Sequence, residues 1–123
     1  QNKVEQHYRL SILDVIHQLN KPNLPIPTMI SHQLLNNLNF IHLEMFYYGY
    51  PIVHNCDPFQ NCGYFYNEHN IEQGSKVLEQ VKNHDDNLED YLERGKKIIF
   101  RFSPSNPKNI KQYRKIINEI LNN

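Results

Sequence analysis

Apolar residues recur at helical spacing in five parts of the chain. Residues 3–20 carry one every three or four positions, and the same spacing returns in residues 38–48, 70–81, 88–102 and 107–121. An apolar stripe with this period is typical of a helix that buries one face. We therefore expect five helices, separated by segments rich in Asn, Asp, Pro and Gly.

Three short runs between these segments read as strands. They are TMIS (28–31), PIVH (51–54) and GYFY (63–66), each β-branched, apolar or aromatic. Pro51 suits the first position of a strand. Gly49 suits the left-handed position just after the helix that precedes it. Short apolar strands that alternate with helices predict a parallel sheet covered on both faces.

The expected fold class is therefore α/β: a Rossmann-like half domain with a short parallel sheet of about three strands, flanking helices and a helix-rich C-terminus. We treat residues 1–123 as a single domain or a fragment of one. The order of elements fits a small α/β layer structure. It also fits the later half of a doubly wound domain whose first strands precede Gln1.

Polar residues next to the helices predict where two of them begin. Asn70 can cap one helix, with Gln73 at the capping-box position. Asn106 as cap and Pro107 as first helical residue predict the start of the last helix. We expect the apolar stripe of that last helix to be buried: Ile110, Tyr113, Ile116, Ile117, Ile120 and Leu121.

Charge and hydropathy narrow the range of partners. Lys+Arg and Asp+Glu both total 13, so the net charge is zero and gives no overall footprint for nucleic acid. No apolar run approaches the 18 or so residues of a membrane span, and no signal peptide begins the chain. We expect a cytoplasmic protein without nucleic-acid partner or membrane span; for a viral protein the place would be the host cytoplasm or the virion.

The two cysteines, Cys56 and Cys62, fall in one predicted loop. Two cysteines do not make a disulfide framework. With His54 and His69 they could form a zinc set, but the spacing lacks a compact Cys-x-x-Cys pair. Two free thiols are the simpler interpretation, and we expect no metal and no cofactor.

Polar side chains gather where the first two predicted strands end. Ligands of open parallel sheets bind beyond the carboxyl ends of the strands, and helix N-termini there favour anions such as phosphate. Either histidine of this group could contact a phosphate, act as a general base or simply end a strand. The candidate binding residues in this region are Ser31, His32, Gln33, Asn36, Asn37, Asn39, His54 and Asn55.

Three further residues carry two interpretations each. Glu44 lies within about two turns of its helix start; it could accept hydrogen bonds from ribose hydroxyls, or it could be solvated or paired with a lysine. Arg101 could clamp a diphosphate with two hydrogen bonds or pair with a surface carboxylate. Tyr64, like the tyrosines at 47, 48, 50 and 66, could stack on a base or sugar or belong to the core and sheet face.

The segment LEMFYYGYPIVH (43–54) resembles the segment of GT-B glycosyltransferases written L-E-A-M-A-x-G-x-P-V-V-A. Glu44, Gly49 and Pro51 fall on its pattern without a gap, as do Ile52 and Val53. The resemblance implies that Glu44 binds the ribose of a nucleotide-sugar donor.

The same motif places a second acidic residue eight positions before the first. This chain has Asn36 there, and Asn37 and Asn39 stand where small glycines usually follow. The carboxylate that contacts the sugar in GT-B enzymes is therefore missing.

The chain is still more similar to a glycosyltransferase-like family of unknown function found in bacteria and large DNA viruses. The similarity covers roughly residues 28–121 and is most specific over residues 31–66. The shared stretches are SHQ (31–33), LN (38–39), LE (43–44), GYP-V-HN (49–55), GY-Y (63–66), HD-NL (84–88), RFSP (101–104) and NP-N (106–109).

This resemblance implies the donor-binding, C-terminal half of a GT-B-like enzyme that transfers a hexosyl group from a nucleoside-diphosphate sugar. It implies a saccharide or other acceptor and an N-terminal Rossmann-like domain outside this chain. The alternative, based on Asn36, is a catalytically inactive module that binds carbohydrate or nucleotide. A third interpretation is an oligomerisation module that forms a homo-oligomer.

Overall fold

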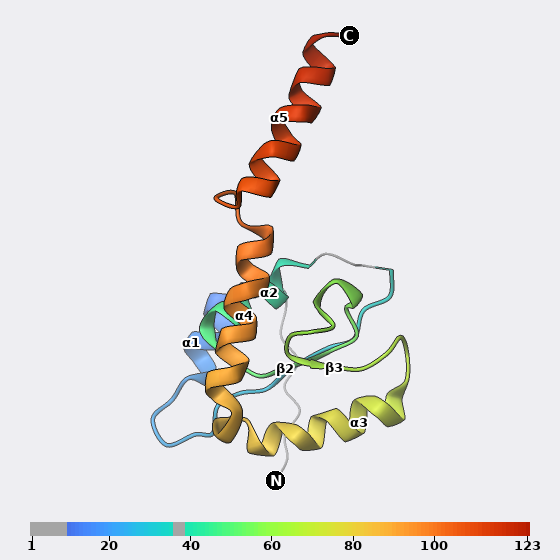
Figure 1. Ribbon diagram of the computed structural model, residues 1–123. Helices are drawn as coiled ribbons and strands as arrows, with labels where there is room; N and C mark the ends of the chain where they lie inside the picture. Colours follow the sequence, from blue (N-terminus) through green and yellow to red (C-terminus); the bar gives the residue numbers. More distant parts are fainter. Residues whose placement is uncertain (1–9, 36–38) are drawn as a thin grey trace.

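The computed structural model describes residues 10–35 and 39–123 and confirms the α/β class (Figure 1). A three-stranded sheet lies between helices, with strands β1 (Met29–Ser31), β2 (Ile52–His54) and β3 (Tyr64–Phe65) in that spatial order. Both strand pairs are parallel. Each strand is one or two residues shorter than predicted from its apolar run.

The strand register brings the three carboxyl ends to one edge of the sheet. Ser31 lies opposite His54, and His54 lies opposite Phe65. The next residue of each chain segment therefore leaves the sheet at the same edge. This edge is where ligands bind in open parallel sheets.

In the described ranges, five α-helices surround or extend from the sheet. The first begins at Ile12, where the Ser11 side chain accepts from the Asp14 N–H at 3.2 Å. Residues 10 and 11 of the predicted helix over residues 3–20 are therefore not helical, and residues 3–9 lie outside the described part of the chain. The predicted break between the third and fourth helices consists of two short 3₁₀ turns, Val81–Asn83 and Asp85–Asn87. The helices are α1 (Ile12–Leu19), α2 (Phe40–Tyr48), α3 (Ile71–Gln80), α4 (Leu88–Phe102) and α5 (Pro107–Leu121).

The α2–β2 connection forms as the sequence predicts. Gly49 has φ of 72°, in the left-handed region where a side chain is unfavourable. The N–H of Tyr50 donates to the carbonyl of Met45 at 3.0 Å, and the N–H of Gly49 donates to that of Phe46 at 3.3 Å. This pair of bonds is a Schellman motif, which satisfies carbonyls at the end of α2.

The core lies where α2 meets α4 on one side of the sheet. Gly95 of α4 lets the helices approach closely, because a Cβ there would lie 3.2 Å from the Phe46 carbonyl oxygen. The Tyr91 hydroxyl donates to the Tyr50 carbonyl at 2.7 Å and accepts from the Ile52 N–H at 3.2 Å. Tyr91 thereby joins α4 to the start of β2.

Both predicted helix caps are confirmed, with one difference in detail. The Asn70 side chain accepts from the Gln73 N–H at 2.9 Å, and that of Asn106 accepts from the Lys108 N–H at 3.0 Å. The Gln73 side chain, however, accepts from the N–H of Asn67 at 2.8 Å. It thus reaches past the cap instead of closing a capping box.

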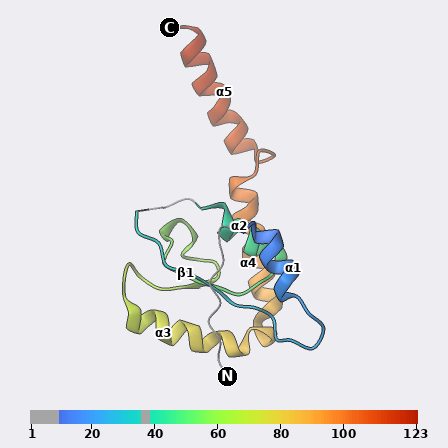
Figure 2. The same cartoon turned by 180° about the vertical axis from the view of Figure 1, so that it is seen from behind.

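The prediction of a buried stripe on the last helix is wrong for the structure described. α5 projects away from the sheet and the other helices (Figures 1 and 2). Its apolar side chains are correspondingly exposed, with Tyr113 at 67% and Ile120 at 69%. The periodicity predicted the helix correctly. It did not predict that the apolar stripe would be exposed in the described part of the protein.

Candidate ligand-binding crevice

Three side chains form a hydrogen-bonded chain at the carboxyl edge of the sheet. His32 follows β1, and its Nδ1 lies 2.7 Å from the hydroxyl oxygen of Tyr66, which follows β3. The Nε2 of His32 lies 3.1 Å from Nδ1 of His69. The rings of His32 and Tyr66 are nearly parallel, at 12°. We call these three residues the histidine–tyrosine chain.

One assignment of protons satisfies every group in this chain. A neutral imidazole has one donor nitrogen and one acceptor nitrogen. If Tyr66 donates to His32, then His32 donates to His69, and the second nitrogen of His69 faces solvent. Tyr66 is 3% exposed, and burial raises the pKa of its hydroxyl. The chain therefore connects a buried hydroxyl to two exposed imidazoles.

Asn55, which follows β2, holds the neighbouring loops in place. Its Oδ1 accepts from the Gln33 N–H at 2.8 Å. Its Nδ2 donates to the carbonyls of Gln33 at 2.9 Å and Glu68 at 2.6 Å. Both amide hydrogens are thus used within the protein, so Asn55 shapes the crevice and has no free N–H for a ligand.

Gln33 has an unsatisfied acceptor beside this bridge. Its Nε2 donates to the Ser31 hydroxyl at 3.0 Å, while its Oε1 is buried and has no hydrogen-bond partner among the described residues. An unsatisfied buried acceptor costs about 1–3 kcal/mol. A ligand hydroxyl that donated to Gln33 would remove this cost.

An apolar hollow borders the histidine–tyrosine chain. It measures about 290 Å³ and lies between the sheet and α3. His32 and Tyr66 line it together with Ile30, which is 62% exposed despite its place in β1. Gly74 of α3 faces the Tyr66 ring, and a Cβ there would make an ordinary contact with it at 3.4 Å.

His54 is predicted to face the crevice, but it lies in the core. It is fully buried, its Nε2–H donates to the Cys62 carbonyl at 2.8 Å, and its Nδ1 accepts from the Cys56 N–H at 3.2 Å. Burial lowers its pKa to about 4, the Cys62 carbonyl partly opposes this shift, and nearby His42 adds to it. The reason is positional: as the last residue of the central strand, His54 points into the α2 side of the sheet.

Glu44 lies on the exposed face of α2, the fifth of its nine residues. It is about 7.5 Å along the helix axis from the capping residue Asn39. Asn39 itself uses its Oδ1 to accept from the Ile41 N–H at 3.1 Å. No hydrogen bond joins Glu44 to the histidine–tyrosine chain in the described part of the protein. The predicted site residues Asn36 and Asn37 lie outside the described residues.

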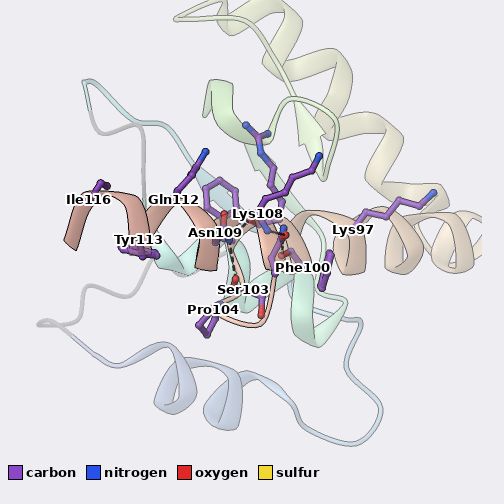
Figure 3. A pocket seen from close by; sticks show the side chains of 12 residues that line it. Lys97, Phe100, Ser103, Pro104, Lys108, Asn109, Gln112, Tyr113 and Ile116 are labelled. Carbon is purple, nitrogen blue, oxygen red and sulfur yellow. Dashed lines mark hydrogen bonds between the residues drawn. The ribbon is translucent and has the colours of Figure 1, made fainter. Parts of the chain in front are cut away.

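Arg101 lies in the last turn of α4. The hollow where α4 and α5 meet is shown in Figure 3. Arg101 lines this hollow of about 1010 Å³, with its guanidinium 5.4 Å from the Phe102 ring centre. Phe102 in turn packs on Phe59, in the loop after β2. The end of α4 is thus on the carboxyl side of the sheet, but Arg101 belongs to a separate hollow.

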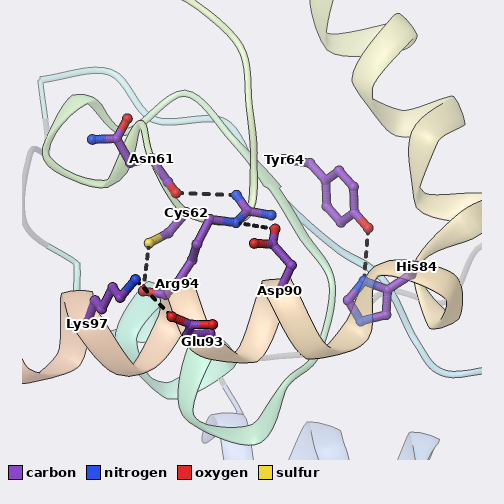
Figure 4. Close-up of polar contacts among 8 residues, drawn as sticks. All are labelled: Asn61, Cys62, Tyr64, His84, Asp90, Glu93, Arg94 and Lys97. Carbon is purple, nitrogen blue, oxygen red and sulfur yellow. Dashed lines mark hydrogen bonds and ion pairs between the residues drawn. The ribbon is translucent and has the colours of Figure 1, made fainter.

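The Tyr64 hydroxyl points toward His84 (Figure 4). Its hydroxyl lies 2.9 Å from Nδ1 of His84, whose Nε2 lies 3.2 Å from the Gly49 carbonyl oxygen. Gly49 precedes β2, so this contact lies toward the amino ends of the strands. The alternative interpretation of Tyr64 as a core residue fits this position.

The proposed zinc residues are not brought together. His69 belongs to the histidine–tyrosine chain, whereas His54 bonds the backbone on both ring nitrogens. Cys56 and Cys62 are buried thiols, and burial raises the pKa of each. Over residues 10–35 and 39–123, no three His, Cys, Asp or Glu side chains lie close enough to hold a metal ion.

From sequence, Tyr66 is considered only as a residue that could stack on a ligand, and His69 only as a zinc candidate; neither is predicted to bind through hydrogen bonds. The strand-end rule that selected His32 and Asn55 would also have selected Tyr66, the first residue after β3. His69 follows a loop in which Glu68 has a positive φ of 46°. No local sequence signal places that loop against β1.

The fold and the crevice define a small α/β protein with a polar site at the carboxyl edge of a parallel sheet. No helix in the described ranges has the length and apolarity needed to cross a membrane.

Residues 23–117 match the family described as "Protein of unknown function (DUF2827)", and the chain belongs to this family. No curated protein and no solved structure matches the chain.

Proposed function

We propose that this chain is the donor-binding part of a GT-B-like glycosyltransferase and binds a nucleoside-diphosphate sugar at the carboxyl edge of its sheet. The observation that carries the proposal is the convergence of His32, Tyr66, His69 and Gln33 at this edge. Open parallel sheets bind nucleotides at this place.

The crevice offers the donor two kinds of contact. The exposed imidazole of His69 supplies an N–H donor for a diphosphate oxygen, and a protonated imidazole strengthens such a bond. His32 positions this ring through the hydrogen bond between the two imidazoles. The Oε1 of Gln33, which is buried and has no partner among the described residues, would accept from a sugar hydroxyl once its amide turned toward the crevice. The mixture of an anion donor and a hydroxyl acceptor suits a nucleotide sugar better than a free anion.

Glu44 is the proposed ribose ligand, by resemblance of its segment to GT-B enzymes. A carboxylate accepts hydrogen bonds from two neighbouring hydroxyls, which is the arrangement that a ribose presents. Its exposure on α2 leaves the carboxylate accessible. The hexosyl acceptor would be bound by an N-terminal Rossmann-like domain outside this chain.

A second candidate function is donor or carbohydrate binding without transfer. It is favoured by Asn36, which stands where GT-B enzymes carry the carboxylate that contacts the sugar. Donor binding without transfer or hydrolysis would support this candidate. Measurable hydrolysis of the bound donor would contradict it.

Backbone NMR of the ¹⁵N-labelled protein tests the proposed site. Uridine, guanosine and adenosine diphosphates and their glucose conjugates are titrated in turn. At least one should shift the amide signals of residues 31–33 and 66–69 in a saturable manner. Shifts confined to the junction of α4 and α5, or no shift with any ligand, would contradict the proposal.

A further inference from the structure

Although the net charge of the chain is zero, its basic residues are concentrated toward one end. Residues 94–118 contain eight of the 13 Lys and Arg residues and no Asp or Glu. The rest of the chain holds the other five basic residues and all 13 acidic ones. The basic segment comprises the second half of α4, the turn after it and most of α5. Charge asymmetry of this kind indicates a polyanionic or membrane partner.

α5 combines this charge with an exposed apolar stripe. At 100° per residue, Ile110, Ile117 and Leu121 lie within a narrow arc of the helix. Lys108, Lys111 and Lys115 lie on the opposite side. The helix stands clear of the domain (Figure 1), and the apolar stripe is exposed, including Ile117 at 52% and Leu121 at 76%. Basic amphipathic helices of this kind bind in the plane of a membrane interface.

The hollow between α4 and α5 brings both features to one place. Lys97, Arg101 and Lys108 line it, and Lys97 also pairs with Glu93 at 2.9 Å. Tyr113 and Ile116 of the apolar stripe line it too (Figure 3). Among the described residues, no acidic side chain lines this hollow of about 1010 Å³. Cations and apolar groups that face the same space suit a lipid phosphate together with the adjoining acyl region.

We propose that α5 and the hollow at its start form an interfacial anchor for an anionic lipid bilayer. The apolar stripe enters the boundary between headgroups and acyl chains, and the cations pair with lipid phosphates. The helix lies on the bilayer and does not span it. A nucleic acid would pair with the cations but leave six large apolar side chains in water, so lipid fits the surface better. The proposal is independent of the donor site.

Vesicle co-sedimentation of the full chain tests the anchor. Vesicles of phosphatidylcholine with 30% phosphatidylserine are compared with pure phosphatidylcholine vesicles at about 0.1 M and 0.5 M salt, which differ strongly in screening. We expect binding to the anionic vesicles at low salt, and much weaker binding at high salt or to neutral vesicles.

Paired variants separate charge from apolar contact. Lys111→Gln with Arg114→Gln removes two exposed cations of α5 and should lower the partition coefficient about 25-fold, since each cation contributes about fivefold near an anionic surface. Ile117→Ser with Ile120→Ser should abolish most binding. The control, Lys76→Gln with Lys82→Gln, removes the same charge outside the basic segment and should leave partitioning unchanged. Circular dichroism checks that each variant is folded.

Three results would overturn the anchor. One is an absence of binding to anionic vesicles. Another is vesicle binding that the control variant lowers as much as the α5 variant does. The third is a dimer in sedimentation equilibrium that Ile117→Ser disrupts, without vesicle binding, because the stripe would then be covered by a second copy of the chain.

Discussion

His32 and His54 both stand at a strand's carboxyl end, yet only one of them is exposed. His54 is the last residue of the central strand, and its ring packs at 5.2 Å from His42 and 6.1 Å from Phe46. His32 is one residue beyond an edge strand, where the chain leaves the sheet. A difference of one position therefore separates a buried structural imidazole from an exposed one in the candidate crevice.

The buried His54 predicts how stability depends on pH. Its folded pKa of about 4 lies below the ordinary value of 6.5, so the folded state disfavours the proton that the unfolded state accepts. This contribution to stability is present above pH 6.5 and is lost as pH falls toward 4. From pH 7.5 to 5.5, His54 alone should lower the free energy of unfolding by about 1.3 kcal/mol.

His42, whose pKa burial also lowers, acts in the same direction. Urea unfolding at several pH values measures the slope. A free energy of unfolding that stays constant between pH 7.5 and 5.5 would contradict the buried neutral state of His54.

The hydrogen bonds of the Asn55 side chain predict that its loss lowers stability by a large amount for one amide group. Asn55→Ala leaves the N–H and carbonyl of Gln33 and the carbonyl of Glu68 without their partner, and should cost about 2–3 kcal/mol. Asn61→Ala, at an exposed loop position, serves as the matched control and should change stability by less than about 0.5 kcal/mol. Equal unfolding midpoints in urea for the two variants would show that the bridge contributes little.

At the scale of elements, local signals predicted the helices and strands well. The caps Asn70 and Asn106 and the left-handed Gly49 act within a few residues, so the sequence around them determines their structure. The surroundings of α5 could not be predicted in this way, because the period of an apolar stripe does not say what covers it. The same limit applies to Ile30, an apolar strand residue that remains exposed.

Two glycines predict opposite effects of the same substitution. At Gly49, with φ of 72°, a Cβ would be strained and would lie 2.7 Å from Leu92 Cδ2, so Gly49→Ala should cost at least about 1 kcal/mol. At Gly74, inside α3, a Cβ meets Tyr66 at an ordinary 3.4 Å. Gly74→Ala should therefore stabilise the protein by about 0.5–1 kcal/mol. Thermal unfolding compares them, and a stabilised Gly49→Ala variant would contradict the left-handed cap.

At the scale of the whole molecule, the sheet edge and the basic end define two separate surfaces. The strand-end rule predicted the region of the crevice and its members Ser31, His32 and Gln33 from sequence. It also selected His54 and Asn55, whose side chains bond within the protein. Which strand-end residues face a ligand depends on the strand order and on the loops that cross the edge. These are tertiary features that a single strand's sequence does not carry.

Calorimetric titration of the nucleotide sugar identified by NMR tests the central claim, that this crevice binds a nucleotide-sugar donor, most directly. The protein should bind one equivalent, and His69→Ala and Glu44→Ala should each weaken the affinity about tenfold, as expected for loss of a charge-assisted hydrogen bond. Glu79→Ala, which removes an exposed carboxylate from α3, should bind like the unchanged protein. No binding of any nucleotide sugar, or equal affinity in all four proteins, would contradict the account.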